Sequence, residues 1–131
     1  MRPSTTAEKQ AKLEARNLVK HFGLAGSTVK ALDGFSLTAM DNEFVALVGP
    51  SGCGKSTFLR MVAGLTDLEE GTILVDGKPV SGPGPDRGMV FQSYTLFPWL
   101  TVLDNVIFPL RKSELTSQER EEVAMGYLEA V

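Results

Sequence analysis

The chain has 131 residues, of which 43% are hydrophobic and 22% charged, and its formal net charge is −3. These proportions are ordinary for a folded protein, and they exclude a disordered or collagen-like chain. The interspersed, slightly acidic charge gives no basic stripe for nucleic acid, and no apolar run approaches the ~20 residues of a membrane helix.

The N-terminal part of the sequence predicts a tail followed by two strands. Residues 1–11 are polar and are expected to form a flexible tail, so that the folded part would span 12–131. Two runs of alternating hydrophobicity, 13–22 and 31–40, predict strands. The glycine-containing stretch 23–27 predicts the turn between them.

A second turn at Asp41 and Asn42 leads into a run, 44–48, in which every residue is apolar. This pattern predicts a strand buried on both faces of a parallel sheet. A glycine-rich loop follows, and residues 56–62 then predict a helix that ends near Gly64.

The middle of the sequence predicts a hairpin and one further strand. Residues 72–75 and 78–80 flank Asp76-Gly77, a dipeptide typical of a tight hairpin turn. A glycine- and proline-rich loop comes next, and 88–92 is then expected to form a short buried strand.

The C-terminal part of the sequence predicts two helices. Residues 101–111 favour a short helix interrupted near Pro109. Thr116 and Glu119 have the spacing of a capping box. Apolar residues recur every fourth position behind this box, which predicts a helix continuing to Val131.

The glycine-rich loop matches the phosphate-binding pattern G-x-x-x-x-G-K-[ST] in full. Its candidate nucleotide-binding residues are Gly49, Pro50, Ser51, Gly52, Cys53, Gly54, Lys55, Ser56 and Thr57. Glycines let successive backbone N–H groups point at phosphate oxygens, and the following helix adds its positive N-terminal end. Lys55 is expected to reach the β- and γ-phosphates and the Ser56 hydroxyl to ligate Mg²⁺. Cys53 occupies a free position of the pattern and is expected to have no catalytic role.

A chance match is the alternative, but the apolar run before the loop and the helical pattern after it favour a functional site. A GTPase would be expected to carry Asp-x-x-Gly after the loop, and no aspartate here begins that pattern.

The motifs together resemble the ATPase subunits of ABC transporters. Residues 49–57 are similar to their Walker A motif, and 88–92 followed by 96–102 is similar to their Q-loop. The resemblance implies that Gln92 helps to bind Mg²⁺ and that Phe22 stacks on adenine. A core role for Phe22 remains the alternative.

This resemblance, which runs from about residue 13 to 131, implies an α/β fold. It would be a P-loop NTPase (RecA-like) ABC ATPase core with an antiparallel β subdomain. The cofactors would be ATP and Mg²⁺, with Ser56 and Gln92 as metal ligands. Asn42 stands where the family usually has glycine, and asparagine tolerates the positive φ of such a turn.

The sequences of residues 84–88 and 97–102 are most similar to those of the ATPase subunits of importers of nitrate, sulfonate or taurine. The implied partners are a transmembrane permease, a second ATPase subunit in a homodimer and, indirectly, a solute-binding protein. The expected location is the cytoplasmic face of the membrane, as a peripheral subunit. The run 94–99 is expected to help to receive the permease, with ordinary core packing as the alternative.

Three motifs of the family are missing from residues 1–131: the Leu-Ser-Gly-Gly-Gln signature, the Walker B Asp-Glu and the switch histidine. Two hypotheses follow. The sequence could be the front part of a transport ATPase, truncated before the signature and Walker B motifs. It could instead be a non-catalytic nucleotide-binding or partner-docking remnant. In either case little ATP hydrolysis is expected of residues 1–131 alone, because the catalytic residues of the family are not among them.

Overall fold

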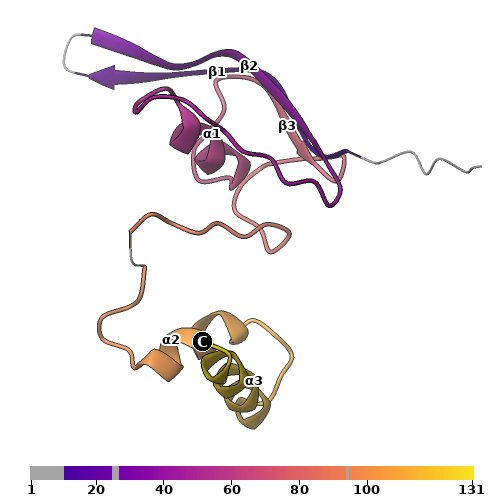
Figure 1. The fold of residues 1–131 in the computed structure, drawn as a ribbon, viewed down its shortest axis with the longest axis vertical. Coiled ribbons are helices and arrows are strands. Elements are labelled where there is room, and N and C mark those ends of the chain that lie inside the picture. The colour runs from indigo at the N-terminus through magenta and orange to yellow at the C-terminus, as the bar shows by residue number, and fades with distance from the viewer. Residues whose placement is uncertain (1–10, 25–26, 94) are drawn as a thin grey trace, which may run out of the picture. The chain divides into compact units, whose positions relative to one another are not determined.

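The computed structural model describes residues 11–24, 27–93 and 95–131. The chain divides into two units after Met89, and each is described by itself (Figure 1). Within the described residues, no helix has both the length and the hydropathy needed to cross a membrane.

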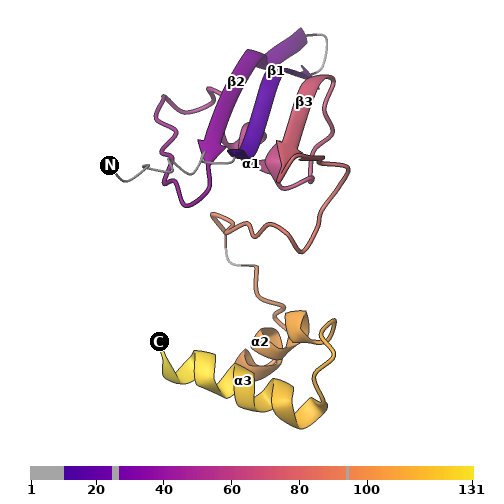
Figure 2. The ribbon, with the colours of Figure 1, turned by 90° about the vertical axis from the view of Figure 1, so that its right-hand side faces the viewer.

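The first unit contains a four-stranded antiparallel sheet in the order β2-β1-β3-β4. Its strands are β1 (Ala11–Leu24), β2 (Ser27–Met40), β3 (Glu70–Val75) and β4 (Lys78–Pro79). Figure 2 shows β1 lying between β2 and β3. The strands predicted at 13–22, 31–40 and 72–75 are confirmed but longer, and the one predicted at 78–80 is confirmed but ends at Pro79. Ala11, placed in the tail by the sequence, begins β1, and the rest of the predicted tail lies outside the described residues.

Helix α1 (Lys55–Val62) packs on one face of this sheet and closes the core. The Phe58 ring meets Phe35 of β2 edge-on, with ring centroids 4.9 Å apart. The buried core cluster consists of Ala15, Leu18, Leu32, Phe58, Met61 and Ile73. Ala15 and Leu18 of β1 are both buried in this core although they are three positions apart, because the strand has a register shift between them and Asn17 there adopts a φ of 50°.

Two of the three predicted turns are confirmed. Of the third, predicted at 23–27, residues 25 and 26 lie outside the described residues, and β1 ends at Leu24 while β2 begins at Ser27. Asp76 and Gly77 have φ values of 49° and 72°, the pair of positive values that a two-residue hairpin turn needs. Asn42 has a φ of 57°, so it adopts the conformation for which glycine would be the default residue.

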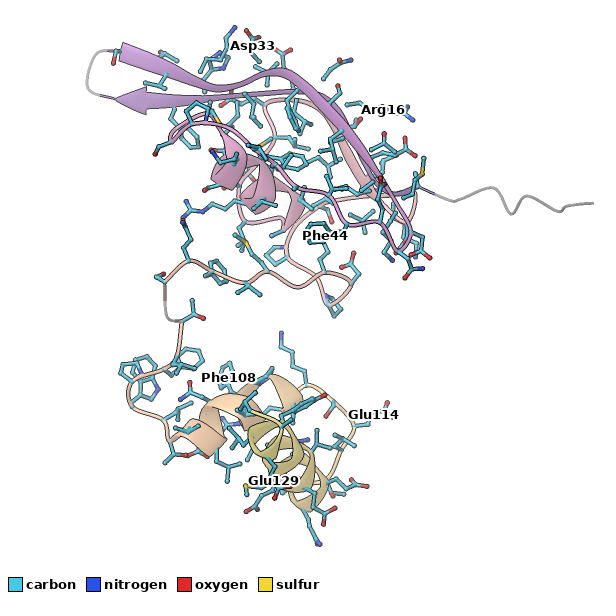
Figure 3. All side chains as sticks on the ribbon, viewed as in Figure 1. Arg16, Asp33, Phe44, Phe108, Glu114 and Glu129 are labelled. Carbon is cyan, nitrogen blue, oxygen red and sulfur yellow. The ribbon has the colours of Figure 1, made fainter. Side chains whose placement is uncertain are left out.

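Two predicted strands are wrong. Residues 44–48 and 88–92 are irregular and join no sheet in the described part of the chain. Phe44, labelled in Figure 3, and Val48 are each 94% exposed, and Val90 is 97% exposed. The physical reason is that a strand exists only when a neighbour pairs with its backbone. The described residues offer no neighbour here, and of the first segment only Leu47 packs on the core.

The second unit contains α2 (Val102–Leu110) and α3 (Ser117–Glu129). Helix α2 contains Pro109, which has no backbone N–H to donate to the Asn105 carbonyl, and the helix ends one residue later. The predicted capping box at the start of α3 is confirmed, because Thr116 and Glu119 each bind the other's backbone N–H. The prediction that this helix continues to Val131 is wrong: it ends at Glu129, with Ala130 as its C-cap.

Candidate functional site

The glycine-rich loop lies directly before α1, and its backbone conformation or close packing favours glycine at three positions. Gly52 and Gly54 have φ values of 80° and 94°, in the left-handed region that other residues avoid. A Cβ on Gly54 would also overlap the Ala31 carbonyl oxygen of β2. A Cβ on Gly49 would lie 2.7 Å from Cys53 Sγ, so the loop closes tightly on itself.

The start of α1 leaves backbone donors without helical acceptors. The first N–H groups of any helix have none, and the N-cap residue Gly54 has no side chain to supply one. Ser56, in this first turn, is exposed. The partial positive charge of the helix N-terminus therefore faces the loop, an arrangement suited to an anion such as phosphate.

The Lys55 ammonium is folded back over the loop. Its Nζ donates to the carbonyl oxygens of Gly49 and Pro50, each at 2.7 Å, and lies 3.3 Å from Cys53 Sγ. Among the described residues, no carboxylate pairs with Lys55. Lys55 is half-buried and has no counterion among the described residues, and it lies beside uncapped N–H groups, an arrangement suited to a negatively charged ligand.

Phe22 lies near the end of β1, where it pairs with Val29 of β2. Its side chain is 42% exposed, which argues against the core role that the sequence left open. The Lys20 ammonium lies 5.7 Å from the centroid of the Phe22 ring, at a distance typical of a cation–π contact.

The topology brings this end of β1 to the loop. Lys20, two residues before Phe22, pairs across the sheet with Leu32. Leu32 Cδ2 lies 2.9 Å from the place where a Cβ of Gly54 would stand. The structure therefore brings Phe22 and the loop, 27 residues or more apart in the sequence, to one region of the first unit.

A cluster around Glu69 adjoins Phe22. The Glu69 carboxylate lies 2.9 Å from His21 Nδ1 and 3.1 Å from Lys20 Nζ, and it accepts the His21 backbone N–H at 3.0 Å. Because a carboxylate only accepts, His21 Nδ1 carries the proton in this contact. Hydrogen bonds from His21 and Lys20 lower the pKa of Glu69 to about 2, so it is ionised at neutral pH.

Sequence reasoning missed this cluster. Glu69 lies 48 residues after His21, and no spacing rule connects the two. The signal that could have found it is the placement of Glu69 directly before β3, a strand that pairs with β1.

The remaining candidate residues stay predictions. Gln92 is exposed in the second unit, so its part in the loop's site is untested. In the run 94–99, Tyr94 lies outside the described residues. Leu96 and Trp99 are exposed, whereas Phe97 packs on Phe108, with ring centroids 4.6 Å apart.

Comparison with known proteins gives a consistent set of relatives. A family model described as "ABC transporter" matches residues 32–130. The chain is 51% identical over 122 residues to an uncharacterized ABC transporter ATP-binding protein of Methanocaldococcus jannaschii, covering 93% of this chain and 46% of that one. It is 50% identical over 120 residues to a nitrate import ATP-binding protein of Synechocystis, covering 91% and 45%. It is 40% identical over 118 residues to a bicarbonate transport ATP-binding protein of Synechococcus elongatus, covering 88% and 18%.

Solved structures agree with these relatives. A dimeric bacterial ABC transporter cassette superposes with a TM-score of 0.79 at 30% identity, over 89% of this chain and 56% of that one. A dimeric ATP-binding cassette in a post-hydrolysis state, bound to ADP and Pi, superposes with a TM-score of 0.78 over the same fractions of the two chains. This likeness confirms the predicted fold class. The chain spans about half the length of the first relatives.

Proposed function

The chain belongs to the ABC transporter family of ATP-binding domains, and on this basis we propose that its glycine-rich loop binds the phosphates of ATP together with Mg²⁺. The observation that carries the proposal is Lys55, a half-buried ammonium that has no carboxylate partner among the described residues. The relative bound to ADP and Pi supports a nucleotide as the ligand.

Each loop residue has a part in this proposal. The uncapped N–H groups at the start of α1 and the left-handed glycines bind phosphate oxygens. Lys55 exchanges its bonds with the Gly49 and Pro50 carbonyls for bonds to the β- and γ-phosphates. Ser56 is exposed at the first turn of α1, and its hydroxyl oxygen is the kind of hard ligand that Mg²⁺ prefers.

Two residues outside the loop complete the nucleotide site. The exposed Phe22 stacks on adenine, and Gln92 contributes a second oxygen to Mg²⁺ and senses the γ-phosphate. Phe22 is supported by its position, since it lies at the end of the hairpin that packs on Gly54. Gln92 is supported by the sequence around it alone.

In the whole protein, the domain would couple ATP hydrolysis to the import of a small anion such as nitrate, sulfonate or taurine. It would work as a homodimer against a transmembrane permease, at the cytoplasmic face of the membrane, with a solute-binding protein delivering the anion. The relatives named for nitrate and bicarbonate support a small anion, and the dimeric cassettes support a second ATPase subunit.

The test is a titration of the Lys55→Ala variant with a fluorescent ATP analogue in the presence of Mg²⁺. Loss of a charge-assisted hydrogen bond costs about 1.5–3 kcal/mol, so affinity should fall roughly ten- to hundredfold. Lys78→Ala is the matched control, because Lys78 is exposed in β4 of the same unit. Equal binding by the wild type and the Lys55→Ala variant would refute phosphate binding at the loop.

A further inference from the structure

The pairing between β1 and β3 stops before the part of β1 that carries Phe22. Its last register pair is Val19 with Glu70. Beyond this point, the β1 edge facing β3 has no strand partner in the described residues, so the backbone of residues 20–22 must bond to side chains or water on that side.

Glu69 supplies these bonds. One carboxylate oxygen accepts both the backbone N–H and the ring Nδ1–H of His21, and the other pairs with Lys20 Nζ. The Glu69 side chain thus makes three contacts with β1 beyond the last residue pair of β1 and β3. Bonds to an ionised acceptor are roughly twice as strong as neutral ones, which suits them to fixing a strand end.

The same contacts fix Lys20 relative to Phe22. Residues two apart on a strand share a face, and the Lys20 ammonium lies 5.7 Å from the Phe22 centroid and 3.1 Å from Glu69. With a cation held over the ring and 42% of Phe22 exposed, the side chain is placed to stack on a flat, uncharged partner. The Lys20 side chain is only 14% exposed, so its position is well restrained.

We propose that Glu69 is a positioning residue for the base of the bound nucleotide, acting through Lys20 and His21 to hold Phe22 ready for stacking. The inference rests on the proposed function, because it takes ATP as the ligand and Phe22 as its stacking residue. Glu69 itself does not touch the nucleotide in this proposal. Its removal should therefore weaken binding only of ligands that contain a base.

The experiment compares the affinities of the intact protein for ATP and for inorganic tripolyphosphate, which has no base. Glu69→Gln should lower the affinity for ATP roughly three- to tenfold, which is part of the full stacking effect. It should change the affinity for tripolyphosphate by less than about twofold. Glu70→Gln is the matched control, since it makes the same charge change at the next residue, which is exposed. Lys20→Gln should give a base-dependent loss of the same kind, should Glu69→Gln fail to fold.

A double-mutant cycle with Phe22→Ala completes the test. If Glu69 acts through Phe22, Glu69→Gln should cause no further loss of ATP affinity in the Phe22→Ala background. The inference would be overturned if the two substitutions caused additive losses of ATP affinity, or if Glu69→Gln did not change ATP affinity. It would also be overturned if Glu69→Gln lowered the affinities for ATP and tripolyphosphate equally, because that would show a purely structural role. If Phe22→Ala itself does not discriminate the ligands, stacking fails and this inference fails with it, whereas Lys55→Ala decides phosphate binding independently.

Discussion

Gly54 shows how much of the site depends on single residues. It must be left-handed to turn the loop into α1, and it must lack a Cβ to pass the Ala31 carbonyl. These constraints are independent, since one is local and the other comes from a strand more than 20 residues earlier. The motif therefore specifies the fold of the first unit as well as the chemistry of the loop.

Gly54→Ala should destabilise the first unit. A non-glycine residue in the left-handed region costs about 1–2 kcal/mol, and displacement of Ala31 and Leu32 adds to this. Gly88→Ala is the control, because Gly88 has no positive φ and its Cβ would meet nothing within 4 Å. Urea unfolding followed by circular dichroism measures both variants. An equal midpoint for Gly54→Ala and the wild type would show that the loop does not have the described geometry.

At the scale of elements, features that depend on residues close in the sequence could be predicted, and features that depend on residues far apart in the sequence could not. The Asp76-Gly77 turn and the capping box at Thr116 depend on residues within three positions of one another, and both are confirmed. The strand predicted at 44–48 needs a neighbouring strand to pair with its backbone, and the apolar composition of the segment does not show whether such a strand is present. The Glu69 cluster depends on contacts across 48 residues, so its chemistry was invisible in the sequence.

Thr116→Ala should destabilise α3. It removes the side-chain acceptor for the Glu119 N–H, a loss that typically costs about 1 kcal/mol. Gly126→Ala in the same helix should act in the opposite direction by roughly 0.5–1 kcal/mol, since its Cβ meets nothing within 4 Å and alanine favours helix. Thermal unfolding of both variants tests the pair, and a shift of the same sign for both would contradict the cap assignment.

At the scale of the whole molecule, the described structure leaves an unusual amount of apolar surface exposed. Phe44, Val48 and Val90 have almost full exposure, and all three lie in segments whose sequence favours strands. Backbone groups in such segments have no ladder partners among the described residues, and they can pair with another chain. A net stability of ~5–15 kcal/mol leaves little margin for solvating such a surface.

A polypeptide of these 131 residues should therefore associate with itself through 44–48. Sedimentation should show concentration-dependent oligomers, and backbone amides of 44–48 should exchange faster in the monomer than those of β1 near Leu18, which is fully buried. Phe44→Lys should reduce association without loss of stability, because a charge on an exposed edge disfavours strand pairing and Phe44 is 94% exposed. Leu47→Lys should instead destabilise the first unit, since Leu47 packs on the core. A wild-type chain that stays monomeric at high concentration, with protected amides at 44–48, would show that this segment is already paired.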